Sequence, residues 1–218
     1  MMSYANIRFQ PKTGPIGLDF DNTIVAYDQV FCRAAQSRGL LPQDFIGTKR
    51  AVRDAIRHLP DGERAWQHLQ GHVYGGLMAE ATLFEGVDRF LRRCRREGVG
   101  LHIVSHKTEY SPVDPLRINL RSTAFGWLEH HGFFADDGFG LARENVHFEA
   151  TRVEKLTRIA ALGCRFFIDD LAEVLNDPGF PPNVGRILFA ASPPDSTPPY
   201  PALANWRQIE LRVFGDDA

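Results

Sequence analysis

The sequence predicts an α/β fold in which a parallel sheet carries a small inserted helical cap. Two observations lead to this prediction. Short apolar runs, each ending at a polar residue, alternate with helical patterns, and one long helical stretch near the start of the chain has no convincing strand within it. Strands that alternate with helices indicate a parallel sheet, because each helix returns the chain to the starting end of the next strand.

The predicted strands are three apolar runs: PIGLD ends at Asp19, GLHIVS at Ser105, and CRFFIDD at Asp169 and Asp170. Such runs are typical of strands that are buried on both faces of a sheet. The helical patterns lie at 86–98 and 151–163, and each is closed by a glycine, as helix C-termini often are. The alternation predicts a Rossmann-like core.

The stretch 28–82 breaks this alternation. Its patterns, such as TKRAVRDAIRHL and GERAWQHLQ, are helical. We therefore expect a core formed by residues 1–27 and 83–218, with 28–82 inserted as a helical cap. Residues 191–201 are too rich in proline for a helix or a central strand, and a short amphipathic piece follows at 203–214.

The composition favours a soluble globular protein with a small-molecule partner. The hydrophobic content of 44% is ordinary, and 25 basic against 27 acidic residues give a net charge of -2, which offers no general attraction to nucleic acid or to an anionic membrane. The start of the chain has neither a basic region nor a long apolar stretch, so we expect a cytoplasmic protein. Three cysteines, far apart and without a CxxC pair, argue against a disulfide framework or a zinc cluster. The oligomeric state is left open.

Two aspartates at the end of the first predicted strand need compensation. Asp19 and Asp21 stand in GLDFDNT, and an ionised carboxylate in an apolar interior is costly unless it is paired or binds a metal. Because the carboxyl ends of parallel strands share one edge, we expect Asp19, Ser105 and Asp169 to meet there. Two unit charges about 4 Å apart repel by about 4 kcal/mol at an effective dielectric of 20, so the cluster requires a cation. Oxygen ligands with open positions suit Mg²⁺.

Four elements, in order, resemble the motifs of the haloacid dehalogenase superfamily: DFDNT, IVSHK with Ser105, a helix carrying Lys155, and FFIDD. Together they span residues 16–170. The resemblance implies that Asp19 is a nucleophile that forms an aspartyl-phosphate, and that Asp21 protonates the leaving oxygen and then activates water. Superfamily members that cleave carbon–halogen bonds lack the second aspartate, so Asp21 points to phosphoryl chemistry.

The resemblance also implies the other roles at this edge. Thr23 would brace the motif loop through its hydroxyl, and Ser105 and Lys155 would bind the phosphate. The residues expected to hold Mg²⁺ are Asp19, Asp21, Asp169 and Asp170. Lys155 lies only fourteen positions before Asp169, a shorter gap than many superfamily members show. Lys107, which we expect to begin an exposed loop, is therefore the rival for the phosphate-binding lysine.

Further side chains are candidates for contact with the substrate. They are Arg53 and Arg57, which share a face of a predicted cap helix, His72 and Tyr74 in the glycine-rich bend GHVYGG, and His106 and Lys107 after Ser105. The two arginines belong to a cationic cluster that begins at Lys49. A solvated helix face is the alternative interpretation of this cluster.

These features predict a Mg²⁺-dependent phosphatase that acts on a small phosphorylated metabolite, because a cap in this position usually closes over small substrates in the superfamily. Two alternatives stay open. A phosphomutase or phosphotransferase would pass the phosphoryl group from the aspartate to another hydroxyl, and a non-catalytic protein of the same fold would only bind. The sequence does not name the substrate.

Overall fold

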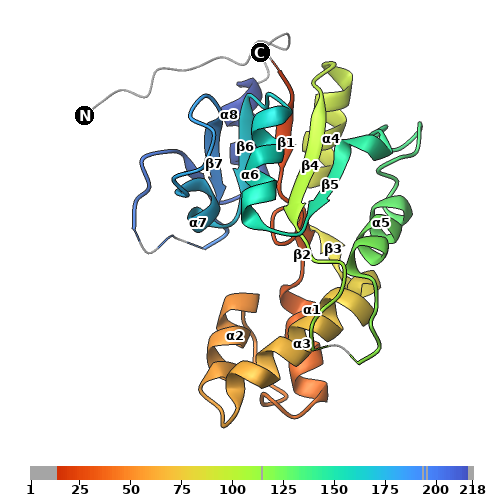
Figure 1. Cartoon of the computed structure of the whole chain (residues 1–218), viewed down its shortest axis with the longest axis vertical. Coiled ribbons are helices and arrows are strands. Elements are labelled where there is room, and N and C mark those ends of the chain that lie inside the picture. Colours follow the sequence, from red (N-terminus) through yellow and green to blue (C-terminus); the bar gives the residue numbers. More distant parts are fainter. Residues whose placement is uncertain (1–13, 114, 193, 195, 216–218) are drawn as a thin grey trace.

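The structure is a computed structural model that describes residues 14–113, 115–192, 194 and 196–215. Figure 1 shows a twisted sheet flanked by helices, with a separate group of helices beyond one end of the strands. The expected lack of a targeting segment concerns residues 1–13, which lie outside the described residues. In the described part of the chain, no helix is long and apolar enough to cross a membrane.

Six parallel strands form the main sheet of the described chain, and the three predicted strands lie at or next to its centre. In spatial order the strands are β5 (Val146–Glu149), β4 (Leu101–His106), β1 (Ile16–Leu18), β6 (Phe166–Asp169), β7 (Gly185–Phe189) and β8 (Ala202–Leu203). The predicted α/β fold with a parallel sheet is confirmed. Leu18 pairs with both Ile103 and Ile168, so the carboxyl ends of β1, β4 and β6 lie side by side.

One glycine lets the central strand fit against its neighbour. A Cβ atom on Gly17 in β1 would lie 2.5 Å from Cδ2 of Phe167 in β6, closer than such atoms approach. Phe167 is fully buried, so its ring has little room to move. The run PIGLD thus combines residues that fill the core with one position that favours glycine.

Helices cover both faces of the sheet and bury two apolar clusters. On one face lie α6 (Arg152–Ala161) and α7 (Ala172–Leu175), and on the other α4 (Val87–Arg96), α5 (Leu120–His130) and α8 (Trp206–Phe214). Helix α6 begins with a capping box, in which Thr151 Oγ1 accepts a hydrogen bond from the backbone N of Glu154 and the Glu154 side chain accepts one from the backbone N of Thr151. This capping box fixes the start of α6 and therefore the position of Lys155.

Residues 28–82, here named the cap segment, lie mostly between two short strands that pair with each other. These are β2 (Val25–Ala26) and β3 (Thr82–Leu83), which are antiparallel. The helices between them are α1 (Asp28–Ser37), α2 (Lys49–Arg57), α3 (Gly62–Gly76) and the 3-10 helix η1 (Met78–Glu80). Figure 1 shows α1, α2 and α3 grouped beyond the carboxyl ends of the sheet.

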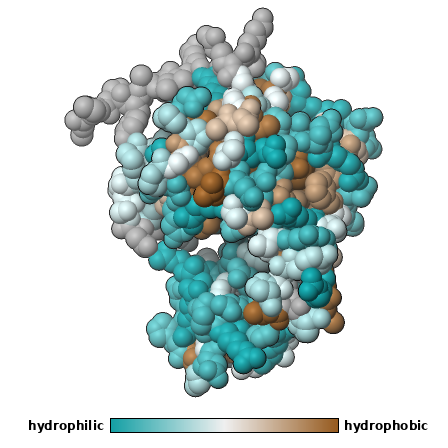
Figure 2. All heavy atoms as spheres, viewed as in Figure 1, coloured by the Kyte–Doolittle hydropathy of each residue, from teal (hydrophilic) through white to brown (hydrophobic). Residues whose placement is uncertain are grey.

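The cap segment has a polar surface and an apolar interior. Figure 2 shows a mainly hydrophilic cap surface and a hollow between the cap and the sheet. Inside the cap, Val52 and Ile56 of α2 and Leu69 and Val73 of α3 are fully buried. The two helices therefore pack through their apolar stripes and leave polar side chains for the surface and the hollow.

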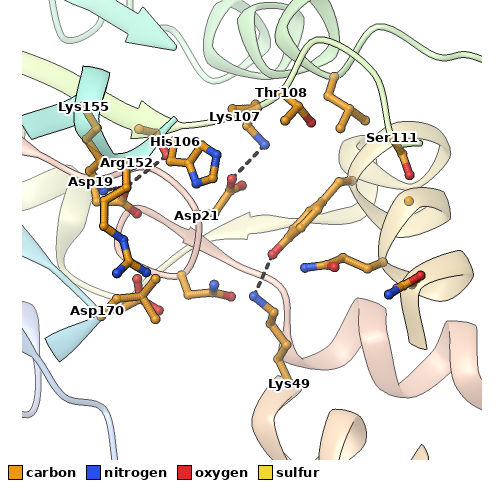
Figure 3. Close-up of a pocket in the computed structure, with 18 of the residues that line it drawn as sticks. Asp19, Asp21, Lys49, His106, Lys107, Thr108, Ser111, Arg152, Lys155 and Asp170 are labelled. Carbon is orange, nitrogen blue, oxygen red and sulfur yellow. Dashed lines mark hydrogen bonds and ion pairs between the residues drawn. The ribbon is translucent and has the colours of Figure 1, made fainter. Parts of the chain in front are cut away.

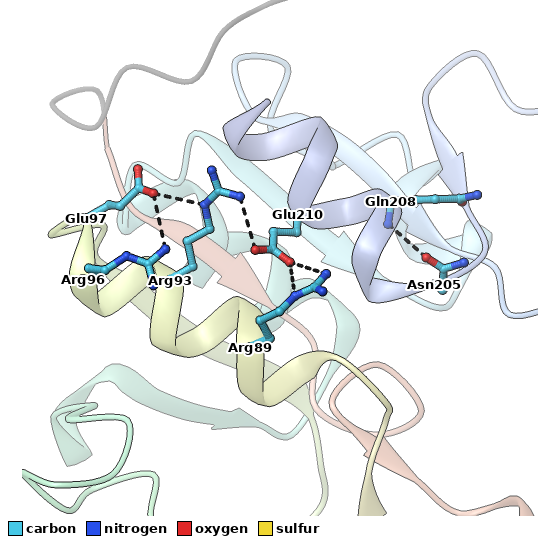
Figure 4. Close-up of polar contacts among 7 residues, drawn as sticks. All are labelled: Arg89, Arg93, Arg96, Glu97, Asn205, Gln208 and Glu210. Atoms are coloured by element: carbon cyan, nitrogen blue, oxygen red, sulfur yellow. Dashed lines mark hydrogen bonds and ion pairs between the residues drawn. The ribbon is translucent and has the colours of Figure 1, made fainter. Parts of the chain in front are cut away.

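A buried ion-pair network joins α4 to α8 (Figure 4). Glu210 accepts hydrogen bonds from Arg93 Nη1 at 3.2 Å and from Arg89 Nε at 2.6 Å, and both Arg93 and Glu210 are buried. We expect Glu210→Ala to lower the free energy of unfolding by about 3 kcal/mol, because the buried guanidinium loses compensating charge. Urea titration measures this change. Glu97→Ala, which removes a more exposed partner of Arg93, should cost less than about 1 kcal/mol, and equal losses would contradict the prediction.

Candidate active site

Asp19 lies at the end of β1 beside two hydrogen-bond donors. Its backbone N donates to the carbonyl oxygen of Ile168 at 2.8 Å, which holds the residue against β6. Its Oδ1 accepts hydrogen bonds from Ser105 Oγ at 2.9 Å and from Lys155 Nζ at 2.6 Å. All three side chains are buried. Residues from three distant parts of the sequence thus meet at one carboxylate.

Lys155 bridges the ends of β1 and β6. Its Nζ lies 2.6 Å from Asp19 Oδ1 and 2.7 Å from Asp169 Oδ2, and the residue is 2% exposed. Burial lowers the pKa of Lys155, but the charges of Asp169 and Asp19 and the hydrogen bonds to them outweigh burial and raise the pKa above its ordinary value. The side chain is therefore a protonated ammonium held between two carboxylates.

Asp21, the second aspartate of the motif, has different partners. Its Oδ1 accepts a hydrogen bond from the hydroxyl of Tyr27 at 2.6 Å, and its Oδ2 lies 2.7 Å from Lys107 Nζ. Lys107 also lies over the rings of Phe20 and Tyr74 and is 4% exposed. The expectation of an exposed loop lysine is wrong here, because the ion pair and the two rings draw the side chain inward.

The DFDNT turn is fixed by one backbone conformation and one hydroxyl. Asn22 has a φ of 60°, a left-handed conformation that asparagine tolerates better than most residues. Thr23 is fully buried, and its Oγ1 accepts a hydrogen bond from the backbone N of Asp170 at 3.1 Å. The hydroxyl therefore ties the turn to the end of β6, next to the carboxylate cluster.

Three carboxylates gather where β1 and β6 end. Oxygens of Asp19, Asp169 and Asp170 lie within 4.8 Å of one another, whereas the Asp21 carboxylate is not part of this group. Burial raises the pKa of Asp19 to about 6, with Lys155 opposing the shift and Asp169 and Asp21 adding to it. Burial, followed by the charges of Asp169 and Asp19, also raises the pKa of Asp170 well above its ordinary value. A cluster of oxygen ligands with excess negative charge fits Mg²⁺.

When a chelator removes bound metal, the free energy of unfolding of the protein should fall as the pH rises from about 4 to about 6. The pKa of Asp19 is about 6 in the folded protein and 3.8 ordinarily, so between these pH values the folded state binds more protons than the unfolded chain. The free energy of unfolding then decreases with rising pH, by up to about 3 kcal/mol from this group. Urea titrations across this pH range measure the slope. Asp19→Asn should make the slope shallower and leave the part that comes from Asp170, and the same slope in both proteins would rule out the assignment to Asp19.

No protein-family model matches the sequence, and no curated protein matches it. Solved structures do match. A HAD hydrolase of family IA, variant 3, from Entamoeba histolytica gives a TM-score of 0.57 at 8% identity, over 92% of this chain and 97% of that one. A HAD family hydrolase from Deinococcus radiodurans, solved with bound phosphate and sodium, gives a TM-score of 0.52 at 17% identity, over 93% of this chain and 95% of that one. A protein described as a dehalogenase gives a TM-score of 0.53 at 14% identity, over 94% of this chain and 99% of that one.

The chain has the haloacid dehalogenase fold. The likeness covers at least 92% of the chain in each of these comparisons, so it extends beyond the sheet into the cap segment. Within this haloacid dehalogenase fold, the elements that resemble the four motifs stand at the carboxyl ends of β1, β4 and β6 and at the start of α6.

A cavity of about 500 Å³ lies between this edge of the sheet and the cap segment (Figure 3). The core lines it with Asp19, Asp21, Ser105, His106, Lys107, Arg152, Lys155 and Asp170, and the cap lines it with Lys49, Gln67, Gln70 and Tyr74. Its volume is in the range of small-molecule pockets. In this haloacid dehalogenase fold, the carboxylates of the motif turn thus face polar side chains of the cap.

Only some of the residues that the sequence suggested for substrate contact line this cavity. Those that line the cavity are Tyr74, His106 and Lys107. His72, Arg53 and Arg57 are not among the described residues that line it. The guanidinium groups of Arg53 and Arg57 pair instead with Asp54 and Glu63.

Several polar side chains that line the cavity were not singled out from the sequence as site residues. Gln67 and Gln70 of α3 are two of them, and Lys49 of α2 was noted only as part of a charged cluster. The expectation of a bend at GHVYGG is wrong, because α3 continues through this stretch to Gly76. Positions 67, 70 and 74 therefore fall on one face of one helix. Once Tyr74 is placed at the site, the helical spacing places both glutamines beside it.

Proposed function

We propose that the chain is a Mg²⁺-dependent phosphomonoester hydrolase that acts through an aspartyl-phosphate intermediate. The observation that carries this proposal is a pair of aspartates that line one cavity in unlike surroundings, Asp19 against Lys155 and Asp21 against Lys107. Two carboxylates in different environments suit different tasks, one as the nucleophile and one as the acid and base. Asp21 also argues against a dehalogenase, since members with that activity lack the second aspartate.

In the first step, a carboxylate oxygen of Asp19 attacks phosphorus, and the bond from phosphorus to the ester oxygen breaks. Asp21 gives its proton to that oxygen, which leaves as an alcohol. Among the described residues, the hydrogen bonds to the Asp19 side chain go to Oδ1, which leaves Oδ2 for the attack. Ser105 Oγ and Lys155 Nζ, beside that carboxylate, would donate to the phosphoryl oxygens.

In the second step, Asp21 takes a proton from water as the water oxygen attacks phosphorus. The bond from phosphorus to Asp19 breaks, phosphate leaves, and both aspartates return to their first state. Tyr27 and Lys107 hold the two oxygens of Asp21 in place between the steps. Asp19, Asp169 and Asp170 would hold Mg²⁺, which supplies positive charge for the phosphoryl oxygens.

A small phosphorylated metabolite fits the proposed site better than a phosphoprotein. The cavity of about 500 Å³ is bounded by the cap segment as well as by the sheet, so a large substrate would have to displace the cap. The Deinococcus radiodurans hydrolase of similar fold was solved with phosphate bound, and phosphate is the product of the proposed reaction. The Asp19 cluster would receive the phosphoryl group, and the cap residues would contact the rest of the substrate.

The test measures p-nitrophenol and inorganic phosphate from p-nitrophenyl phosphate, with Mg²⁺ or with a chelator. We expect equal amounts of both products with Mg²⁺ and neither product with the chelator. Nitrophenol in excess over phosphate when a polyol is added would indicate a phosphotransferase. Chloride release from 2-chloropropionate would indicate a dehalogenase. If neither compound nor any member of a panel of phosphorylated metabolites is turned over, the result would indicate a non-catalytic protein that only binds.

A further inference from the structure

The cap presents one cation to the cavity in unusual surroundings. Lys49, the first residue of α2, lines the cavity and is only partly exposed. Its Nζ donates a hydrogen bond to the hydroxyl of Tyr74 at 2.6 Å and lies 5.7 Å from the centre of the Phe31 ring. Its backbone N donates to Asp28 Oδ1 at 2.7 Å, which anchors the start of the helix. The ammonium is thus held in place by a phenol and by aromatic rings.

The other cations that line the cavity have carboxylate partners within the protein. Lys155 pairs with Asp19 and Asp169, Lys107 pairs with Asp21, and Arg152 lies 3.9 Å from Asp177. Within the described part of the chain, Lys49 forms no ion pair with a carboxylate. Burial lowers the pKa of Lys49, but Tyr74 and the more distant charges of Asp170 and Asp21 outweigh burial and raise the pKa. The ammonium therefore stays charged, and a bound anion would give it a direct ion-pair partner.

Tyr74 adds a second donor at the same place. Its hydroxyl oxygen accepts the hydrogen bond from Lys49, so its own proton can be donated to a ligand. Figure 3 shows Lys49, the partner of Tyr74, on the cap side of the cavity and apart from Lys155 and Asp19. An ammonium and a phenol that act together suit a carboxylate or phosphate oxygen.

The cavity has room for a second anionic group. A single water molecule takes up about 30 Å³, so a phosphoryl group fills only part of about 500 Å³. We propose that Lys49 and Tyr74 bind a second anionic group of the substrate, a carboxylate or another phosphate, while the phosphoryl group to be transferred lies at Asp19. The natural substrate is then a small phosphomonoester with two separate negative groups. This inference rests on the proposed function and adds the class of substrate.

The experiment compares matched substrates in the wild-type protein and in variants of Lys49. One pair is glycerol 3-phosphate and 3-phosphoglycerate, in which a carboxylate replaces a hydroxymethyl group. The other pair is fructose 6-phosphate and fructose 1,6-bisphosphate. We expect kcat/KM to be at least about tenfold higher for the doubly anionic member of at least one pair, the scale of one hydrogen bond to a charged group. Lys49→Met should abolish that preference mainly through KM, and Lys49→Arg should restore part of it.

Two further variants separate the recognition role from a general loss. Tyr74→Phe should reduce the same preference, because it removes the phenol donor and keeps the ring. Arg53→Met changes a cation on the same helix that does not line the cavity and should leave the preference as it is in the wild type. Circular dichroism and thermal unfolding confirm that each variant is folded.

The outcomes distinguish this inference from the proposed function. No preference in either pair, or a preference that depends on Arg53 and not on Lys49, would overturn the inference while p-nitrophenyl phosphate is still hydrolysed. An equal loss on every substrate in Lys49→Met would assign Lys49 to the transferred phosphoryl group and also overturn it. If the wild-type protein hydrolyses no phosphomonoester, the proposed function itself fails.

Discussion

Asp19→Asn is expected to lower kcat for p-nitrophenyl phosphate by at least about 10⁴-fold, a loss typical of removing a nucleophile. The asparagine has nearly the same shape, and its amide oxygen can still accept hydrogen bonds from Ser105 and Lys155. An amide oxygen is a poor nucleophile, so the covalent step is lost even though the contacts persist. The background reaction cannot hide this loss, because uncatalysed hydrolysis of phosphate monoesters is extremely slow.

The same substitution should leave the fold intact and, without metal, should stabilise it. Burial disfavours the charged form of Asp19, and asparagine carries no charge to desolvate. The control is Asp88→Asn, which makes the same chemical change at an exposed position in the first turn of α4. It should leave kcat unchanged and should lower the stability by less than about 1 kcal/mol, because it removes a favourable charge at the helix N-terminus. Residual activity of Asp19→Asn within tenfold of the wild type, in a protein free of wild-type contamination, would exclude Asp19 as the nucleophile.

The central strands could be predicted from the sequence, whereas the outer strands could not. Strands β1, β4 and β6 lie between two neighbours and under helices on both faces, so each one appears as an apolar run. Strand β7 also has two neighbours, but it begins with the half-buried Gly185 and Arg186, and its apolar run is short. Strand β5 lies at the edge of the sheet and alternates buried with half-buried residues, including His147 and Glu149. Strand β8 has only two residues. Neither β5 nor β8 therefore has an apolar run long enough to distinguish a strand from a loop in the sequence.

The positions of the strand-end residues were predictable for a related reason. A parallel sheet brings the ends of its strands to one edge, so Asp19, Ser105 and Asp169 had to lie near one another once the strands were placed. The cap side chains were not predictable in this way, because their directions depend on how α2 and α3 pack. Lys49 faces the cavity, whereas Arg53, one turn later, pairs with its neighbour Asp54. Sequence alone gives both residues the same helical context.

Lys155→Ala is expected to lower kcat by at least about a hundredfold on every phosphomonoester substrate. The substitution removes the ammonium that lies 2.6 Å from Asp19 Oδ1 and 2.7 Å from Asp169 Oδ2, where the transferred phosphoryl group is proposed to bind. The loss of one electrostatic donor in such a site costs about 10² to 10³ in kcat. The leaving group does not contact this lysine in the proposed mechanism, so the factor should be the same for aryl and alkyl phosphates.

Lys107→Ala should cost less with p-nitrophenyl phosphate and more with an alkyl phosphate such as glycerol 3-phosphate. Lys107 pairs with Asp21, the proposed acid, at 2.7 Å, so its removal loosens the group that protonates the leaving oxygen. Nitrophenolate leaves readily without a proton, whereas an alkoxide does not. The measurement is kcat for both variants and both substrates under saturating Mg²⁺. A larger loss for Lys107→Ala than for Lys155→Ala with p-nitrophenyl phosphate would transfer the phosphate-binding role to Lys107, because that substrate depends least on protonation by Asp21.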